Sequence, residues 1–283
     1  MINKFFKKIH KYIIMKIEDF RDIRYEKEEN GILTVTLNKP ERKNALSALT
    51  LLELWYALDH AEIDRQIKVL ILTGQGDAFC SGGYFSQDAL KGIPKDHLNE
   101  VDWKDLTSKK LCLKFWDFQK PVIAAVNGLG VGAGFNIPIL CADFTYASEN
   151  AWFGLYMIKR AVIGDMGSTL LLPLLIGFRK AKELFYLGNK ITAKEAEELG
   201  LINKVLPPDE LISYTRQQAL KMMPPKSPTL ALKLMKRAIH SYYRTLIENH
   251  CDLENEYWAK CIRNKDFTES LNALKEKREP TFK

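Results

Sequence analysis

Long apolar segments are absent from this chain of 283 residues. No apolar run approaches the 18 residues that a membrane-spanning helix needs, so the sequence predicts no membrane span. Cysteine is also scarce, because there are only five, an odd number, and no two are spaced as C-x-x-C. This pattern argues against a disulfide framework and favours a reducing compartment, which we take to be the cytoplasm.

Motifs of hydrolases and metalloenzymes are missing as well. The chain has no G-x-S-x-G and no H-E-x-x-H, and its five histidines are dispersed. We therefore expect neither a nucleophilic triad nor a metal site. No RNA-binding or zinc-finger signature is present, although the formal charge of +7 suits an anionic partner such as a phosphate-bearing small molecule. A nucleic-acid partner is not expected.

Acidic residues are lacking in the first 17 positions, MINKFFKKIHKYIIMKI. Lysines interrupt every apolar run there, which is unlike a secretory signal, and the stretch has no arginine and no serine. We interpret residues 1–16 as a basic N-terminal extension, with mitochondrial targeting as the alternative.

Strand and helix patterns alternate through most of the chain. Strand-like runs lie at 31–38, 68–74, 121–128 and 144–148, and helical spacing occurs at 102–118 and at 47–64, with Ser47 as N-cap. This alternation predicts an α/β fold.

The pattern changes after residue 207, where proline pairs stop two helical segments, 211–223 and 229–262. We therefore predict a core of residues 17–207 and a C-terminal helical region of residues 208–283. Its apolar positions Leu230, Leu234 and Leu253 are expected to be buried within or between subunits.

Two glycine clusters follow predicted strands. NGLGVGAGF (127–135) matches the G-x-G-x-x-A dinucleotide fingerprint, with Glu149 about 20 residues later, but Pro138 interrupts the helix that should follow. A structural tight turn is the other interpretation. With GDAFCSGGYFS (76–86), the same glycines can instead present two backbone N–H groups to one oxygen, which is an oxyanion hole. Two ordinary turns remain the simpler alternative.

A single acid, Asp165, stands between two glycines in RAVIGDMGST, just before the run LLLPLLIGF, which predicts a buried helix. Aspartate favours helix N-caps and the positive end of the helix dipole. An acid facing an apolar pocket has its pKa raised toward the range useful for proton transfer. We predict that Asp165 serves in both ways, as cap and as catalytic acid.

Taken together, several consecutive stretches resemble the crotonase superfamily, the enoyl-CoA hydratase/isomerase family. They are NKPERKNALS, LTGQGDAFCSGG, KPVIAAVNGLGVGAG, YASENAWFG, the stretch from RAVIGDMGST to ITAKEAEELGLINKVLP, and EKREPTFK. The resemblance implies an α/β spiral of ββα repeats with a C-terminal helical trimerisation region. It also implies acyl-CoA thioester substrates, no cofactor beyond the CoA of the substrate, and a homotrimer or hexamer.

The resemblance also assigns roles to residues. Gly83 and Ala133 match the oxyanion-hole donors, each worth about 3 kcal/mol of barrier. Residues that match places where the family meets CoA are Arg42, Lys43, Ser81 and Lys277.

The departures from the family pattern concern the acids. The two glutamates of a typical hydratase fall on Asn136 and Met157, and the usual aspartate after the first oxyanion loop is Tyr84. We assign these three residues to the acyl pocket. Asp165 falls where single-acid enoyl-CoA isomerases carry their catalytic carboxylate. Aromatic acyl-CoA dehalogenases use an aspartate there as nucleophile, but their partner tryptophan would fall on Met157.

The leading hypothesis is therefore a Δ3,Δ2-enoyl-CoA isomerase with Asp165 as its one catalytic carboxylate. The alternatives are an enoyl-CoA hydratase and a non-catalytic CoA- or RNA-binding member of the family.

Overall fold

The computed structural model describes residues 15–85, 91–93 and 105–283, and the strands among them form two sheets. The larger sheet has the order β1-β2-β3-β5-β7-β10 and the smaller one β4-β6-β8-β9. The strands are β1 (Ile23–Lys27), β2 (Ile32–Leu37), β3 (Val69–Gly74), β4 (Ala78–Cys80), β5 (Val122–Val126), β6 (Leu129–Val131), β7 (Phe144–Ser148), β8 (Trp152–Gly154), β9 (Lys190–Thr192) and β10 (Lys204–Leu206).

The chain passes from one sheet to the other in each repeat. β3, β5 and β7 belong to the larger sheet, and the strands that follow them, β4, β6 and β8, belong to the smaller sheet. β1 pairs with β2 antiparallel, whereas β2, β3, β5, β7 and β10 are parallel. This confirms the predicted α/β spiral of ββα units, and the strands predicted from periodicity lie within one or two residues of the observed bounds.

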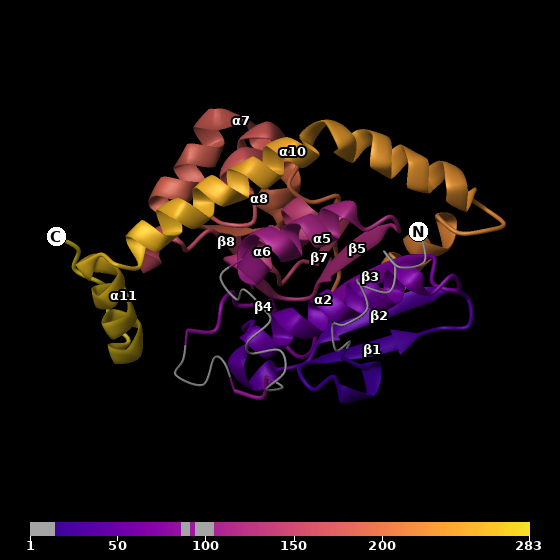
Figure 1. Cartoon of the computed structure of the whole chain (residues 1–283), viewed down its shortest axis with the longest axis horizontal. Helices are drawn as coiled ribbons and strands as arrows, with labels where there is room; N and C mark the ends of the chain where they lie inside the picture. Colours follow the sequence, from indigo (N-terminus) through magenta and orange to yellow (C-terminus); the bar gives the residue numbers. More distant parts are fainter. Residues whose placement is uncertain (1–14, 86–90, 94–104) are drawn as a thin grey trace, which may run out of the picture.

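Helices surround the two sheets (Figure 1). They are α2 (Ala48–Ile63), α5 (Leu111–Asp117), α6 (Ala133–Asn136), α7 (Ser168–Leu187), α8 (Ala193–Glu198), α9 (Leu211–Lys221), α10 (Thr229–Cys261) and α11 (Lys265–Glu276). α2 begins as predicted, because the Ser47 hydroxyl accepts the Thr50 N–H at 3.2 Å in a capping box. The stretch predicted as helical at 102–118 contains α5, and its residues 102–104 lie outside the described residues.

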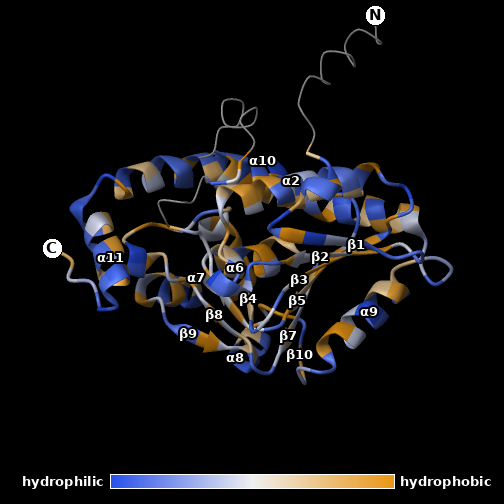
Figure 2. Cartoon of the chain, turned by 90° about the horizontal axis from the view of Figure 1, so that it is seen from below, coloured by the Kyte–Doolittle hydropathy of each residue, from blue (hydrophilic) through white to orange (hydrophobic). Residues whose placement is uncertain are grey.

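The strands supply the core. Leu33, Leu72, Phe79 and Ala124 are each at most 1% exposed. Figure 2 shows this arrangement, with the strands coloured mostly orange or white and the outer helices carrying blue residues. Burying a leucine or phenylalanine side chain contributes about 1.5–3 kcal/mol, so the apolar strands hold the spiral together.

Helix α7 is not the buried helix that LLLPLLIGF predicts. Leu171 and Leu172 are buried, but Leu174, Leu175 and Phe178 are 51%, 50% and 70% exposed. A helix lying on the surface of the spiral buries one stripe only, so the remaining apolar side chains face outward.

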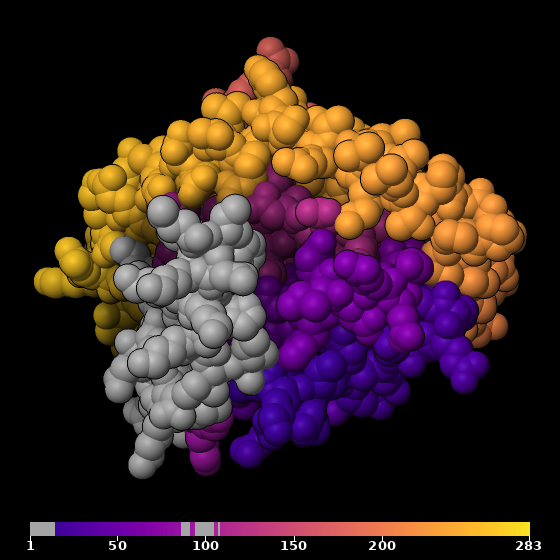
Figure 3. Space-filling view, turned by 45° about the vertical axis from the view of Figure 1, so that its right-hand side comes forward, coloured from indigo at the N-terminus to yellow at the C-terminus, as the bar shows by residue number. Residues whose placement is uncertain are grey.

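The described elements after β10 are all helices, α9, α10 and α11. α10 runs across the molecule against α5 and α7, and its surface meets that of the N-terminal third of the chain (Figures 1 and 3). Leu230, Leu234 and Leu253 are 70%, 55% and 39% exposed, so they are not buried within this chain. Their burial between subunits stays a prediction, as does the division of the chain at residue 207. Of residues 1–16, positions 1–14 lie outside the described residues.

None of the helices in the described part of the chain is both long and apolar enough to cross a membrane.

Candidate active site

Two loops lie against each other at the ends of β4 and β6, which are parallel neighbours in the smaller sheet. A Cβ added to Gly82 would lie 2.8 Å from the carbonyl oxygen of Val131, and one added to Gly134 would lie 2.1 Å from that of Cys80. Gly82 also has a φ of +94°, which favours glycine. The glycines of both clusters are therefore needed because two backbones touch.

Each loop contains a backbone N–H, that of Gly83 and that of Ala133, for which no acceptor is found among the described residues. The Leu46 N–H donates to the Gly82 carbonyl at 2.8 Å and the Tyr84 N–H donates to the Leu46 carbonyl at 3.0 Å, so Gly83 lies between these bonds. Ala133 is the first residue of α6, where helix geometry provides no partner for the N–H. Among the described residues, neither the Gly83 nor the Ala133 N–H donates a hydrogen bond. That the two N–H groups hold one oxygen, as an oxyanion hole requires, stays a prediction.

This geometry does not support the dinucleotide alternative. Gly128 and Gly130 do not form one turn leading directly into a helix, because β6 lies between the glycine at 128 and α6. A Cβ on Gly128 would lie 2.0 Å from the Asp77 carbonyl oxygen. Glycine is therefore required at this position because the two loops are in close contact.

Asp165 is half-buried next to Asn136, which is the last residue of α6 and lies three residues after Ala133. The Asn136 Nδ2 donates to the Asp165 carboxylate at 2.7 Å and to its carbonyl at 3.2 Å. Burial raises the pKa of Asp165 to about 6, against the lowering effect of the Asn136 hydrogen bond. The carboxylate is thus oriented by the same short helix that provides the Ala133 N–H.

The expectation that Asp165 caps the following helix is wrong. The N-cap of α7 is Gly167, without a side-chain cap of its own. Glu254 of α10 takes this place, since its carboxylate accepts the Gly167 N–H at 2.7 Å, the Thr169 N–H at 2.9 Å and the Thr169 hydroxyl at 2.6 Å. The Asp165 side chain is left free of capping, and only its carbonyl accepts the Ser168 N–H at 3.0 Å.

Glu254 is the residue that sequence reasoning missed. It is 2% exposed, and burial raises its pKa to about 7, with the nearby Asp165 charge adding to the increase. It bonds to a loop 87 residues away in the chain. No pattern within α10 indicates this contact, because it depends on how α10 docks across the start of α7.

The other acyl-pocket candidates carry no carboxylate. Asn136 is fully buried, and its Oδ1 has no hydrogen-bond partner among the residues that the structure describes. Met157 is buried and its carbonyl accepts the Val162 N–H at 3.1 Å, which ties it to the loop that carries Asp165. Tyr84 is half-buried with the Arg42 guanidinium 4.7 Å above its ring.

The residues matched to CoA contacts differ in how many of their donors are already engaged by other residues of the chain. The Arg42 guanidinium donates to Asp22 at 2.6 Å and to the carbonyl of Ala45 at 3.0 Å, so most of its donors serve the fold. Lys43 is half-exposed and forms an ion pair with Asp77 at 2.5 Å.

Two further CoA candidates have different surroundings. Ser81 is half-buried in the first oxyanion loop, and its hydroxyl donates to the Arg42 carbonyl at 3.3 Å. Lys277 is exposed and lies just past α11 rather than within it, with a left-handed φ of 55°. Within the described ranges, no group of three His, Cys, Asp or Glu side chains is arranged to hold a metal ion.

Solved structures share this architecture. An enoyl-CoA hydratase/isomerase from Pseudoalteromonas atlantica T6c superposes with a TM-score of 0.81 at 26% identity, covering 93% of this chain and 100% of that chain. An enoyl-CoA hydratase from Bacillus anthracis gives a TM-score of 0.70 at 32% identity, covering 93% of this chain and 99% of that chain. The spiral and its paired loops thus define an enzyme of the crotonase superfamily.

Sequence comparisons agree with the structural ones. The enoyl-CoA hydratase/isomerase family model matches residues 27–283, and the chain belongs to that family. A 1,2-epoxyphenylacetyl-CoA isomerase of Escherichia coli K12 is 34% identical, covering 90% of this chain and 95% of the relative. A short-chain-enoyl-CoA hydratase of Clostridium acetobutylicum is 32% identical, covering 89% of this chain and 94% of the relative.

Proposed function

We propose that this enzyme is a Δ3,Δ2-enoyl-CoA isomerase in which Asp165 exchanges protons with the substrate. The observation that carries the proposal is the difference between two neighbouring carboxylates. Glu254 is buried and accepts three hydrogen bonds from the start of α7, whereas Asp165 is half-buried and, among the described residues, Asn136 is the one side chain that donates to its carboxylate.

The reaction needs one base that later acts as an acid. With the thioester oxygen held by the Gly83 and Ala133 N–H groups, the Asp165 carboxylate removes a proton from C2 of a 3-enoyl-CoA. The electron pair moves into a C1–C2 enolate, whose negative charge the two N–H dipoles stabilise as it develops. Return of the proton to C4 shifts the double bond from C3–C4 to C2–C3, so one carboxylate completes the cycle.

Asn136 suits a carboxyl group that changes its protonation state. Its Nδ2 donates to the ionised carboxylate, and its Oδ1 has no partner among the described residues. After the amide turns over, Oδ1 can accept the O–H of the protonated acid, since an amide is both donor and acceptor. Asn136 therefore orients Asp165 in both halves of the reaction.

Substrate binding and assembly complete the proposal. Lys43 and Lys277, whose ammonium groups face solvent, are proposed to meet the CoA phosphates, with Ser81 and a smaller part for Arg42. Tyr84, Asn136 and Met157 are proposed to line the acyl group. We place the enzyme in the cytoplasm as a homotrimer or hexamer.

An enoyl-CoA hydratase is the second candidate, because several similar proteins carry that name. Hydration needs a water molecule that is activated and oriented, and the two positions of the family's hydratase glutamates hold Asn136 and Met157 here. The isomerase in turn agrees with a relative named as the isomerase of a CoA thioester. A non-catalytic family member has no support from the named relatives.

The test is Asp165→Asn. Its activity on a 3-enoyl-CoA should fall by roughly 10²–10⁴-fold, the usual worth of a positioned acid–base group. Stability and acyl-CoA affinity should change little, because the side chain does not cap α7. The wild-type enzyme should also carry some isotope label from C2 to C4 within one turnover.

The matched control is Asp209→Asn, an exposed acid in the turn before α9, which should retain full activity. A folded Asp165→Asn variant that binds acyl-CoA and isomerises at the wild-type rate would contradict the proposal. Faster hydration of a 2-enoyl-CoA than isomerisation of a 3-enoyl-CoA by the wild type would favour the hydratase instead.

A further inference from the structure

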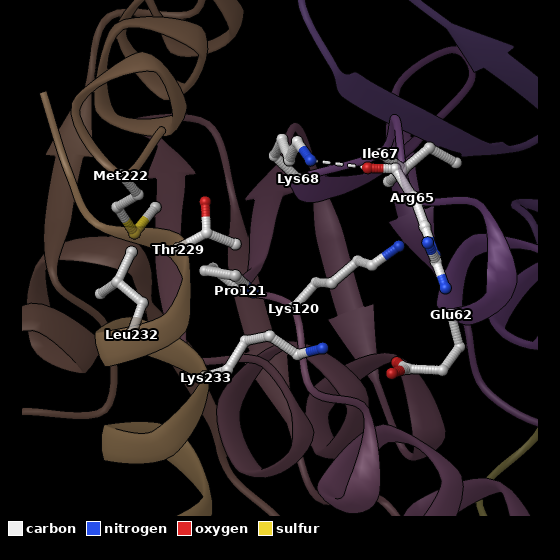
Figure 4. A pocket seen from close by; sticks show the side chains of 10 residues that line it. All are labelled: Glu62, Arg65, Ile67, Lys68, Lys120, Pro121, Met222, Thr229, Leu232 and Lys233. Carbon is white, nitrogen blue, oxygen red and sulfur yellow. Dashed lines mark hydrogen bonds between the residues drawn. The ribbon is translucent and has the colours of Figure 1, made fainter. Parts of the chain in front are cut away.

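A cavity of about 260 Å³ lies where the end of α2 and the turns before β3 and β5 meet the first turns of α10. Figure 4 shows the side chains of Lys120 and Lys233 extending across it toward Arg65 and Glu62. The cavity thus joins the spiral to the C-terminal helices.

Positive charge dominates the lining of this cavity. Four lining residues are cationic and one is acidic, a net formal charge of +3, and they are Arg65, Lys68, Lys120, Lys233 and Glu62. None of the four cations forms an ion pair with a carboxylate of the described residues. Like charges confined in one cavity repel each other, and a bound anion removes that repulsion.

Two of the lysines are held by backbone carbonyls. The Lys120 ammonium is buried and donates to the carbonyls of Ala61 and Asp64, the latter at 2.7 Å. The Lys68 ammonium donates to the Arg65 carbonyl at 2.6 Å. These bonds fix the position of both charges without neutralising them.

The other two cations are free to bind a ligand. In the part of the chain that the structure describes, the side chains of Lys233 and Arg65 have no hydrogen-bond or ion-pair partner. The Glu62 carboxylate accepts the Gln119 N–H at 3.1 Å. Burial lowers the pKa of the Lys120 ammonium, the charges of Glu62 and Asp64 oppose this, and the charge of Lys233 adds to it.

A neighbouring cavity of about 440 Å³ shares Lys233 and provides an internal comparison. Two of its four cations are paired, Lys236 with Asp143 at 2.7 Å and Arg244 with Asp117 at 2.7 Å, whereas Lys233 and Arg237 form no ion pair with a described carboxylate. The smaller cavity therefore holds more unpaired cations, four against two, among the residues that the structure describes.

The opposite wall of the smaller cavity is apolar. Figure 4 shows Met222 and Leu232 on the side away from Arg65 and Glu62, with Pro121 between the two sides and Ile67 beside Arg65. The cavity lies before β3 and β5, at the amino end of these parallel strands, whereas the oxyanion loops follow β4 and β6. It is thus separate from the candidate active site.

We propose that this cavity, hereafter the α2–α10 cavity, binds a small phosphate monoester that carries an apolar group. The phosphate dianion would accept hydrogen bonds from the Lys233 ammonium and the Arg65 guanidinium and lie close to the fixed charge of Lys120. The apolar group would lie on Leu232 and Met222. Binding would join α10 to the end of α2 and stabilise the docking of the C-terminal helices.

The experiment titrates the full chain with phenyl phosphate by calorimetry and by thermal unfolding. Saturable binding of one molecule per chain is expected, together with an increase in Tm. Lys233→Gln and Arg65→Gln should each weaken binding about tenfold or more, because each removes a charge-assisted hydrogen bond. Lys120 is left unchanged, since its ammonium holds two carbonyls of the fold.

Control variants and ligands separate this site from others. Lys226→Gln changes an exposed lysine that does not line the cavity and should leave the affinity for phenyl phosphate unchanged. Inorganic phosphate should bind more weakly than phenyl phosphate, because it lacks the apolar group. Benzoate should also bind more weakly, because it carries a single charge.

Several results would overturn the proposal. They are the absence of saturable binding at millimolar phenyl phosphate, equal affinity in the Lys233→Gln and Lys226→Gln variants, and benzoate binding as tight as phenyl phosphate. Loss of CoA binding in Lys233→Gln would also overturn it, by assigning the cavity to the CoA site. None of these measurements depends on the reaction proposed for Asp165.

Discussion

The pKa of Asp165 depends on its burial and on its neighbour Asn136. Burial in the loop before α7 raises the pKa of Asp165 to about 6, and the Asn136 hydrogen bond lowers it again. A base with a pKa near 6 is mostly ionised at neutral pH and still strong enough to remove a proton. The surroundings of this one residue therefore set the pH range in which the proposed isomerase is active.

The pH dependence of isomerisation should follow from this acidity. The carboxylate must be ionised to act as base, so kcat/KM should fall as the pH drops through about 6. Asn136→Leu removes the hydrogen bond that favours the ionised form, so the pKa of Asp165 should rise and the acidic limb should move to higher pH. Rate profiles between pH 4.5 and 8 measure both.

Asn272→Ala, at an exposed position in α11, is the control and should keep the wild-type profile. An acidic limb that stays in place or moves to lower pH in Asn136→Leu would show that Asn136 does not set the acidity of the base.

At the scale of secondary-structure elements, helix α10 supplies the side chain that caps helix α7. The Glu254 carboxylate accepts the N–H groups of Gly167 and Thr169 at the start of α7, where helix geometry leaves donors without partners. The loop that carries Asp165 immediately precedes this start. Docking of α10 therefore holds the loop that carries Asp165 in place, although Glu254 lies far from that loop in the sequence.

Glu254→Gln should change how stability depends on pH. The pKa of Glu254 is raised from 4.5 to about 7, so the folded state binds this proton more tightly than the unfolded state. In the wild type, the free energy of unfolding should therefore decrease by up to about 3 kcal/mol as the pH rises from 4.5 to 7. Glutamine does not titrate, so this decrease should be absent from the variant.

Urea unfolding of both proteins across this pH range measures the difference, in which the titration of groups distant from Glu254 cancels and that of Asp165, whose charge acts on Glu254, does not. Glu256→Gln changes an exposed neighbour on α10 and should leave the wild-type pH dependence in place. If the free energy of unfolding changes with pH in the same way in the wild type and in Glu254→Gln, the Glu254 carboxyl is not the cause of that change.

In the described part of the molecule, α10 carries several large apolar side chains that are exposed. Leu230, Leu234, Ile239 and Tyr242 of α10 are 70%, 55%, 64% and 75% exposed. Large exposed apolar patches mark surfaces that another chain covers. The apolar positions predicted from the sequence are therefore exposed in the described chain, and their burial against a second copy stays a prediction.

Light scattering should report a trimer or a multiple of three at micromolar concentration. Leu230→Lys combined with Leu234→Lys places two charges in the apolar surface, so the equilibrium should shift toward monomers. Ile63→Lys, at the end of α2 and 76% exposed, should leave assembly unchanged. A wild-type monomer at every concentration would contradict the predicted trimer.

Local patterns determined the elements of this fold. The apolar strands at 31–38 and 68–74 and the capping of α2 by Ser47 were predictable, because strand period and capping depend on residues a few positions apart. The two glycine clusters also predicted facing loops, since glycine is required where two backbones approach closely. The order of the motifs identified the superfamily.

Contacts between segments distant in the sequence decided which residues cap, pack against or face one another. Only the docked α10 shows that Glu254, and not Asp165, caps α7, and only the assembled surface shows that much of LLLPLLIGF faces outward. The charges of Arg65 and Lys233 likewise meet in one cavity although they lie far apart in the chain. Burial, and with it the pKa of a carboxyl group, depends on the surroundings in three dimensions, which no short sequence window contains.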